Sequence, residues 1–413
     1  MLRIFLAATL IDALGSGLWV PFALLFLVHG QGMGLVDAGA SLSTGALLAL
    51  VTGPATGAAM DRFGPRALLI AGNLVRLAAF AAYPLAHTSW QVIVVSTVAG
   101  FGDRLFWTCN APMVARLTTG RDTDHVLATQ TVGRFAGAGL GAAAMAVLPT
   151  ITSPWAFHLL AYANAASFAV AALLLWMLKG TFVASDETKV PFSAPDAGKV
   201  PFSPPGGSWR AVLGDRAFSG FCVTHMAFTL ASASKFSVLP IVVRDLLHGP
   251  QWIAGTAITA GTVVVVTAQR PIVGLLAGRS RTAGLIGSAV LFSVCFALLI
   301  PLEAVSLPVA TVLILLTSLG FSVAEALFGP TATAAAAAAA PPGAEGRASS
   351  IFQLSWGLPI ALAPGLLATL LSASNALTWS ILALTCASAV PALLVLRRKL
   401  PVALREPSPP VVA

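Results

Sequence analysis

Apolar segments long enough to cross a bilayer recur along almost all of this 413-residue chain. A membrane-spanning helix needs roughly 20 predominantly apolar residues, and twelve segments reach that length. They cover approximately residues 4–28, 36–59, 66–87, 90–115, 126–149, 155–178, 217–243, 251–276, 282–302, 306–338, 348–372 and 376–396. Only 9% of residues are charged and the mean hydropathy is +0.89, which lies outside the usual range of soluble domains. The sequence therefore predicts an all-α polytopic membrane protein.

Most of the 23 Lys and Arg residues fall in every second connection between these spans. Cytoplasmic connections hold an excess of basic residues, so the bias predicts that both termini are cytoplasmic and that the number of spans is even. The net charge of +8 then reflects insertion topology, and we expect no nucleic-acid partner. Arginine far outnumbers lysine and alanine is abundant, which favours the inner (plasma) membrane of a bacterium. The N-terminal segment lacks a clear cleavage site, so we interpret it as a retained first span.

A stretch rich in Pro, Ser and Gly, residues 179–209, divides the chain. We expect an N-terminal six-helix half at 1–178, a cytoplasmic linker at 179–209, a C-terminal half at 210–396 and a cytoplasmic tail at 397–413. The linker contains KVPFS twice. That repeat is either a partner-binding motif or, the simpler interpretation, a local duplication in a tolerant segment.

The two halves carry faint internal symmetry. The segment GAAMDRFGPR, which begins at Gly57, has a counterpart in GLLAGRSR from Gly274, and DRLF at 103–106 has one in EALF at 325–328. Gln130 matches Gln353 at nearly the same offset. Such repeats indicate two pseudo-symmetric six-helix halves, a plan in which the substrate site lies near the mid-depth between them.

The segment GAAMDRFGPR resembles the loop signature GxxxDRxGRR of the major facilitator superfamily, although Pro65 replaces a basic residue. The resemblance implies that fold, with twelve transmembrane helices in two halves, and transport by alternating access. It also implies a conformational latch on the cytoplasmic side, for which Arg116 is the candidate partner of the acid. The expected latch residues are Gly57, Asp61, Arg62, Gly64, Arg66 and Arg116.

A second segment, GRFAGAGLGA, is similar to the fifth-helix signature GxxxGPxxGG of many exporters in that family. Gly133, Gly137 and Gly141 match, whereas Ala138 and Ala142 replace the proline and the final glycine. Close helix packing explains a glycine stripe in a membrane more often than export does, so the segment favours export only weakly.

Seven charged residues fall well inside the spans, where each costs roughly 2.5 to 3.5 kcal/mol on insertion scales. They are Asp12, Arg76, Asp103, Arg104, Arg134, Lys235 and Glu325. Asp103 and Arg104 are adjacent and point about 100° apart on a helix, so each needs a partner on another helix. We predict a charge network of Asp12, Asp103, Arg104 and Arg134, with Glu325 as the acid of the other half. Snorkelling or a bond to a carbonyl explains Arg76 and Lys235 equally well.

Aromatic and amide side chains share helix faces with these charges, which predicts a substrate cavity with stacking and hydrogen-bonding surfaces. The candidate cavity residues are Trp19, Phe106, Trp107, Asn110, Gln130, His225, Gln353 and Trp356. Packed aromatic core and a structural, hydrogen-bonded histidine are the plainer alternatives.

Our first functional hypothesis is a proton-coupled exporter of a small amphipathic compound, such as a drug or secondary metabolite. Asp12, Asp103 and Glu325 are then the candidate proton carriers. The first alternative is proton-coupled uptake of a small organic anion held by Arg104 and Arg134, and the second is a membrane binding partner that transports nothing. The chain has no GxxxxGKS loop, no HExxH spacing and no GxSxG elbow, so we expect neither an enzyme nor a bound metal or cofactor. We expect a monomer whose partners are substrate, protons and lipid.

Overall fold

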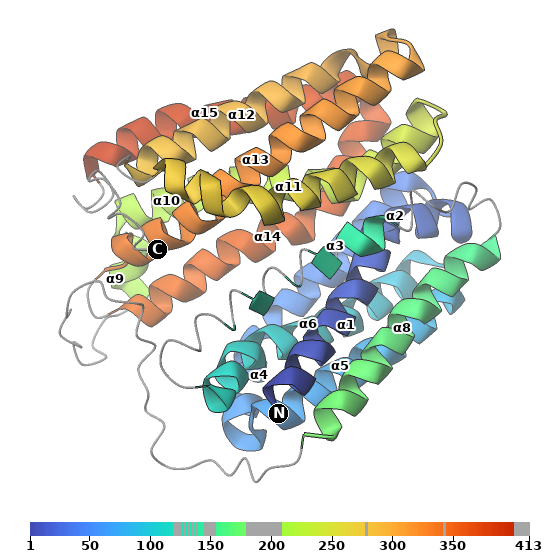
Figure 1. Cartoon of the computed structure of the whole chain (residues 1–413), viewed down its shortest axis with the longest axis vertical. Helices are drawn as coiled ribbons and strands as arrows, with labels where there is room; N and C mark the ends of the chain where they lie inside the picture. The colour runs from blue at the N-terminus through green and yellow to red at the C-terminus, as the bar shows by residue number, and fades with distance from the viewer. Residues whose placement is uncertain are drawn as a thin grey trace.

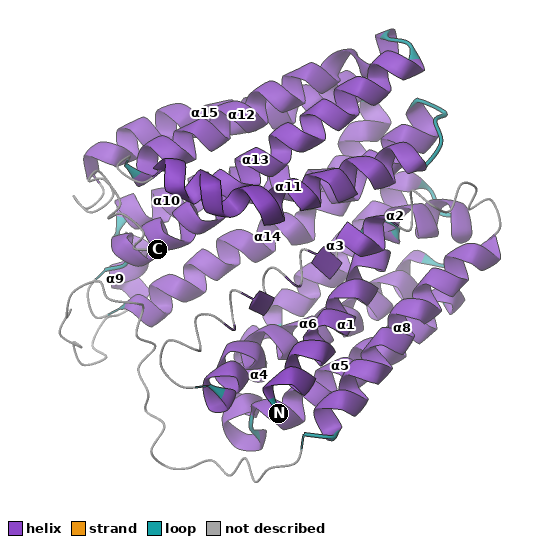
Figure 2. Cartoon of the chain, viewed as in Figure 1, coloured by secondary structure: helices purple, strands orange, loops and turns teal. Residues whose placement is uncertain are grey.

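A computed structural model of the chain consists of long helices arranged in two bundles (Figures 1 and 2). It describes residues 1–118, 154–178, 209–276, 280–341 and 344–399, together with single positions between 126 and 143. All the elements identified in these residues are helical. The linker with its KVPFS repeat and the C-terminal tail lie outside the described residues.

The N-terminal half holds nine described helical elements, several of which combine in one span. They are α1 (Leu2–Trp19), α2 (Ala23–Leu25), η1 (Phe26–Gly30), α3 (Leu35–Val51), α4 (Gly53–Phe63), α5 (Pro65–Ala82), η2 (Tyr83–Leu85), α6 (Ser89–Leu117) and α8 (Pro154–Trp176). Pro21, which has no N–H to donate, lies between α1 and α2, where the first span is interrupted.

The C-terminal half has a parallel series. Its elements are α9 (Trp209–Gly214), α10 (Arg216–Ile241), η3 (Val242–Leu246), α11 (Trp252–Leu276), α12 (Arg281–Leu299), η4 (Ile300–Ala304), α13 (Leu307–Ala339), α14 (Glu345–Ala373) and α15 (Asn375–Lys399). The first span of each half ends in one π-helical turn, η1 or η3. Such turns are rare and occur frequently at functional sites.

The described helices fit the predicted spans. Eight are long and apolar enough to cross a membrane, and two shorter apolar helices, Leu35–Val51 and Trp252–Ala268, fall in the second and eighth predicted spans. The first predicted span is built from α1, α2 and η1. The fifth, 126–149, lies mostly outside the described residues, so the structure is consistent with twelve spans without establishing the number.

Packing is mainly within each bundle. In the first half α5 packs on α6 and α8, α3 on α6, and α1 on α8; in the second α13 packs on α11 and α12, and α10 on α14 and α15. The pair α3 and α14 joins the two halves. We call the end at which α1 begins the near end and the end at which η1 finishes the far end. In Figure 1 the bundles meet around α2 and α3 at the far end and diverge toward α4 and α9 at the near end.

Glycine permits the closest approaches between helices. A Cβ on Gly137 of the fifth span would lie 2.8 Å from the Ala13 backbone of α1, so the predicted glycine stripe packs against the first span. Likewise, a Cβ on Gly39 of α3 would lie 2.5 Å from the Pro364 carbonyl oxygen of α14. The two halves therefore touch backbone to backbone near the far end.

Candidate functional site

Arg76 lies at the centre of the N-terminal bundle and binds two carboxylates from two other helices. Its Nη1 donates to Asp12 Oδ1 on α1 at 3.0 Å and to Asp103 Oδ1 on α6 at 3.1 Å. Its Nη2 donates to Asp12 Oδ2 at 3.3 Å and to Asn73 Oδ1 at 3.1 Å. We call Asp12, Arg76 and Asp103 the N-half triad. It ties α1, α5 and α6 together at one depth.

Small and aromatic neighbours explain why this guanidinium is held there. A Cβ on Gly102 would lie 2.6 Å from Arg76 Cγ, so the glycine leaves room for the arginine stem. The guanidinium carbon lies 4.3 Å from the ring centre of Phe168 and 5.2 Å from that of Phe106. Aromatic faces attract a cation, most strongly away from water. The site therefore stabilises the charged arginine even though only 2% of its side chain is exposed.

The two carboxylates of the triad differ in environment. The Asp12 side chain is 1% exposed, binds Arg76 through both oxygens and accepts a bond from Ser16 Oγ at 3.3 Å. The Asp103 side chain is 53% exposed and binds Arg76 through one oxygen. Both carboxylates thus bind the same guanidinium, one from a buried and one from a half-exposed position. The exposed carboxylate, Asp103, is the one that a proton from outside the bundle reaches first.

The C-terminal bundle holds a balanced pair instead. Lys235 Nζ on α10 lies 3.2 Å from Glu325 Oε2 on α13 and donates to Ser322 Oγ at 3.5 Å. The two charged side chains are 3% and 14% exposed. We call Lys235 and Glu325 the C-half pair. Asp103 and Glu325, which correspond in the sequence repeat, thus both bind a buried cation, but the cation comes from a different helix of each half.

This geometry corrects the interpretation of two buried cations. Arg76 and Lys235 bind carboxylates rather than snorkelling to an interface or binding a lone carbonyl. Their depth is the signal that identifies them, because snorkelling needs a position close to a helix end and Arg76 lies well inside α5. Arg104, which we predicted in the network, lies toward the other half: a Cβ on Gly357 of α14 would be 3.9 Å from its Nη1. Arg134 lies outside the described residues.

Two of the predicted cavity residues are packed in bundle cores. Trp19 is 6% exposed, and its ring centre lies 4.7 Å from that of Tyr83 and 5.1 Å from that of Phe80. His225 is 2% exposed, and its Nδ1 shares a hydrogen bond with Ser355 Oγ at 2.8 Å. The rings of Phe221, Phe328, Phe352 and Trp356 surround it. The plainer alternative, aromatic core with a hydrogen-bonded histidine, describes the surroundings of Trp19 and His225.

Proline in α14 explains one further bond of this cluster. Pro359 has no N–H for the carbonyl of Ser355, four residues earlier. That carbonyl accepts a hydrogen bond from Thr229 Oγ1 of α10 at 3.1 Å. The proline-rich part of α14 is therefore tied to α10 by both the backbone and the hydroxyl of one serine.

Other predicted cavity residues are more accessible. Trp107 is 52% exposed, one helical turn from Asp103 on α6, and its ring lies edge-on to the buried Phe106. Asn110 and Gln130 exchange two amide hydrogen bonds of 3.2 and 3.3 Å, which joins α6 to the fifth span. On α14, Gln353 is exposed and Trp356 is half-buried. Asp103 and Trp107 are thus both about half exposed on α6, although Asp103 also binds Arg76 on α5.

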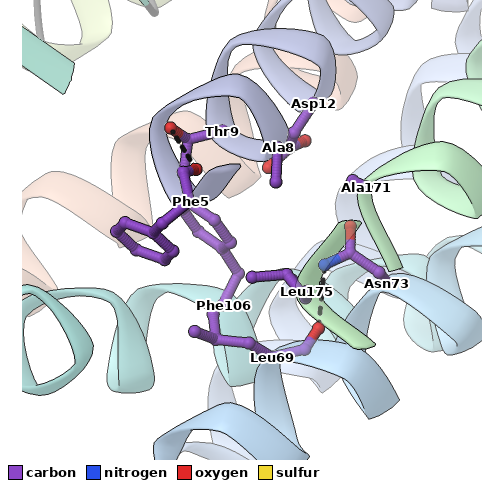
Figure 3. Close-up of a pocket in the computed structure, with 9 residues that line it drawn as sticks. All are labelled: Phe5, Ala8, Thr9, Asp12, Leu69, Asn73, Phe106, Ala171 and Leu175. Atoms are coloured by element: carbon purple, nitrogen blue, oxygen red, sulfur yellow. Dashed lines mark hydrogen bonds between the residues drawn. The ribbon is translucent and has the colours of Figure 1, made fainter. Parts of the chain in front are cut away.

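A narrow pocket reaches Asp12 from within the N-terminal bundle (Figure 3). It lies among α1, α5, α6 and α8, and its lining consists of Phe5, Ala8, Thr9, Asp12, Leu69, Asn73, Phe106, Ala171 and Leu175. The polar lining groups are already engaged: Thr9 Oγ1 donates to the Phe5 carbonyl and Asn73 Nδ2 to that of Leu69. Phe106 thus lines this internal pocket beneath Asp12.

The loop signature lies at the near end. Gly64, at φ +76°, is in the left-handed region that favours glycine, and a Cβ there would lie 3.7 Å from Arg116 Nη1. Arg66 donates from Nε and Nη2 to the carbonyls of Leu175 and Trp176, at 3.2 and 2.6 Å, where α8 ends. Arg62 is exposed over the Phe63 ring. Gly57 and Asp61 lie in α4, and the Asp61 side chain falls outside the described part of the chain.

Contacts between the halves gather toward the far end. Ser43 Oγ on α3 donates to the Leu362 carbonyl of α14 at 3.2 Å and accepts from the Gly365 N–H at 2.8 Å. Thr259 Oγ1 of α11 donates to the Gly139 carbonyl at 3.2 Å, and His29 Nε2 lies 2.8 Å from Asp245 Oδ1. At the near end, α4 packs on α3, α5 and α6, whereas α9 packs on α10 and α14.

Two related helical bundles with buried charges at mid-depth and an interface between them define a polytopic membrane transporter. The chain belongs to the Major Facilitator Superfamily, whose family model matches residues 4–364. Members of this family and the relatives described below are membrane transporters rather than enzymes, in agreement with the expectation from the sequence.

Curated relatives are similar over part of the chain. "Multidrug resistance protein MdtH" of Klebsiella pneumoniae (strain 342) is 27% identical over 237 residues, which are 57% of this chain and 54% of that protein. The protein of the same name from Salmonella typhimurium (strain LT2) is 25% identical over the same shares of both chains. The matched segment thus spans about half the length of these relatives.

Solved structures are similar over nearly the whole chain. A POT family transporter in complex with 5-aminolevulinic acid has a TM-score of 0.75 at 14% identity, covering 97% of this chain and 96% of that one. The nucleoside transporter NupG has a TM-score of 0.69 at 14% identity, covering 96% and 99%. At this identity the similarity shows the fold alone.

Proposed function

We propose that this protein is a proton-coupled exporter of a small amphipathic compound that works by alternating access. The observation that carries the proposal is the arrangement of the N-half triad, in which a half-exposed, negatively charged carboxylate shares its cation with a buried one. A proton on Asp103 neutralises that charge and leaves Arg76 to Asp12. The triad therefore has two states that differ by one proton, as a coupled transporter requires.

Asp103 is well placed to connect proton binding with substrate binding. It is half exposed on α6, one turn from the exposed ring of Trp107. Gln353 and Trp356 of α14 offer an amide and an indole from the other half. A compound with an apolar ring and a polar group finds stacking and hydrogen-bonding partners on both walls. Because its arrival removes water from Asp103, binding changes how strongly that carboxylate holds its proton.

We infer the orientation and the resting state from charge and packing together. The excess of basic residues in the connections at the near end places that end, and both termini, in the cytoplasm of a bacterial cell with the protein in its inner membrane. The contacts between the halves lie toward the far end. This arrangement corresponds to an inward-facing conformation, which a monomer can adopt without a partner chain.

Export is favoured over uptake by the relatives. The matched segments belong to proteins named for multidrug resistance, and the glycine stripe of the fifth span fits the exporter signature in three positions. The glycines also pack on α1, which explains them without export. The stripe therefore adds little to the evidence for export that the relatives provide.

Uptake of an organic anion remains the alternative to test, because Arg104 lies where α6 approaches Gly357 of the other half. Arg76 is the less suitable cation for an anion site, since its Nη atoms already bind two carboxylates. Arg104→Ala should abolish binding of an anionic substrate and leave binding of a neutral one intact. A membrane binding partner that transports nothing would show no flux of any compound.

The proposal is tested in proteoliposomes with an imposed pH gradient and a panel of neutral, cationic and anionic amphipathic compounds. We expect accumulation of at least one compound in vesicles that are acidic inside, with the cytoplasmic face outward, and loss of that accumulation when a protonophore collapses the gradient. Asp103→Asn should lose the gradient-driven accumulation. Accumulation that ignores the gradient overturns proton coupling, and the absence of flux for every class overturns transport by this protein alone.

A further inference from the structure

We propose that His29 and Asp245 form a pH-sensitive latch that holds the two halves together at the far end. His29 is in η1 and Asp245 in η3, the π-helical turns that end the first span of each half. His29 Nε2 and Asp245 Oδ1 are 2.8 Å apart, and the two residues are 216 positions apart in the chain. This spacing is close to the offset of the sequence repeat.

The two halves are related by a pseudo-symmetry axis that runs between them. Residues at equivalent positions of the two repeats can contact each other only close to that axis. The latch therefore joins the bundles close to the line about which they rock, where α2 also packs against α10. Alternating access requires the far end to open in each cycle, so this contact must break in each cycle. The inference goes beyond the proposed function, because it depends on alternating access by the family fold and on no particular substrate or proton carrier.

The contact responds to pH because only protonated histidine makes it an ion pair. His29 and Asp245 are 27% and 37% exposed, so protons reach them from the solution at the far end. Imidazole is the side chain that ordinarily changes charge between about pH 5 and 8. Below that range the pair is His⁺ with a carboxylate and the far end is held closed. Above it, a neutral imidazole and a carboxylate remain, and the latch weakens.

Other ionisable groups among the described residues lie near the latch, including the exposed His248, three residues after Asp245. Arg244 precedes Asp245 in η3, and its guanidinium lies 6.0 Å from the ring centre of Phe157 on α8. Asp37 is in the first turn of α3, and His158 of α8 lies beside Phe26 of η1; these helices are the ones that pack on η1. Arg244 keeps its charge across this range, and His158 is in contact with the Phe26 ring within the bundle. Among these groups, His29 is the one that itself forms the bond between the halves.

The latch can be tested without a substrate by measuring how far apart the bundles are at the far end. Spin labels are attached at Leu85→Cys and Glu303→Cys, two exposed positions where η2 and η4 end the third and ninth spans. The parent chain, whose four cysteines are buried, controls for background labelling. Distances are measured in lipid nanodiscs at about pH 5.5 and about pH 8, on either side of the histidine range.

We expect the wild type to show one short distance at the lower pH and an additional, longer distance at the higher pH. His29→Lys keeps a cation at both pH values and should retain the short distance at both. His29→Gln and Asp245→Asn should each show the short and the longer distance in the same proportions at both pH values. His87→Gln, which removes an exposed histidine outside the contact at the far end of the same half, should behave as the wild type.

The latch is overturned by a wild-type distribution that ignores pH, or by a His29→Gln protein that retains the wild-type response. A pH response that follows His87 instead also contradicts it. The experiment measures a distance in the absence of any compound. A negative result for the latch therefore does not contradict the proposed transport function, and a negative result in the transport assay does not contradict the latch.

Discussion

The N-half triad and the C-half pair occupy corresponding places and differ in how many carboxylates share the cation. Both contain an acid at the repeat position, Asp103 or Glu325, bound to a buried cation. In the first half the cation also binds a second, buried carboxylate, and the acid at the repeat position is half exposed; in the second half one lysine binds one mostly buried glutamate. The difference teaches that the first half is suited to exchange a proton, whereas the second is suited to hold α10 and α13 together.

The largest expected effect comes from removing the shared cation. Arg76→Met should lower the free energy of unfolding by about 3–5 kcal/mol, because it leaves two carboxylates without their partner inside the bundle. Arg76→Lys should lower the free energy of unfolding by less, since it keeps the charge and loses only the bidentate bond to Asp12. Denaturant unfolding in detergent measures both. An Arg76→Met protein as stable as the wild type would show that the triad does not hold the helices together.

The balanced pair should behave differently when both charges are removed. Lys235→Met alone should lower the free energy of unfolding by up to about 3 kcal/mol, because it leaves the mostly buried Glu325 without its lysine. The double variant Lys235→Met with Glu325→Gln should recover most of that loss. The same unfolding measurement on the two single variants and the double variant gives the coupling. Additive losses would mean that the two residues contribute independently.

Replacing the two acids of the triad should have different effects on the melting temperature of the protein. Asp12→Asn should lower the melting temperature in detergent, because it breaks the buried bidentate bond to Arg76. Asp103→Asn should leave the melting temperature unchanged or higher, since it changes a half-exposed carboxylate and keeps the guanidinium paired with Asp12. Equal losses in both variants would mean that the acids are equivalent and that the exposed one is no proton site.

The smallest effects should come from the serines that bind one charged group of each half. Ser16→Ala removes the donor to Asp12 and Ser322→Ala removes the acceptor of Lys235, and each should cost about 1 kcal/mol, the size of one hydrogen bond. Thermal unfolding of the two variants side by side provides the comparison. A loss several times larger at either site would show a role beyond one hydrogen bond.

Much of the fold was predictable because bilayer physics acts on composition along the chain. Long apolar segments, the positions of Lys and Arg and the loop signature at Gly57 indicated the helical class, the two halves and the superfamily. The breaks at Pro21 and the π-helical turns η1 and η3 were not predictable, because they depend on where the bundles touch.

The candidate site was predictable in its acids and not in its cations. Asp12, Asp103 and Glu325 stood out as isolated charges in apolar segments, and each has a buried basic partner. Arg76 and Lys235 were ambiguous because a long basic side chain can also reach a helix end. Whether these cations reach a helix end or bind a carboxylate depends on which helices pack on α5 and α10. A single sequence does not specify that packing.

The most direct test of the central claim is to measure proton release when a transported compound binds to the solubilised protein in weakly buffered solution. The account predicts that binding to the wild type releases a proton, that Asp103→Asn releases none while still binding the compound, and that Glu325→Gln releases as the wild type does. Proton release that persists in Asp103→Asn, or that disappears only in Glu325→Gln, would contradict the assignment of the proton site to the N-half triad.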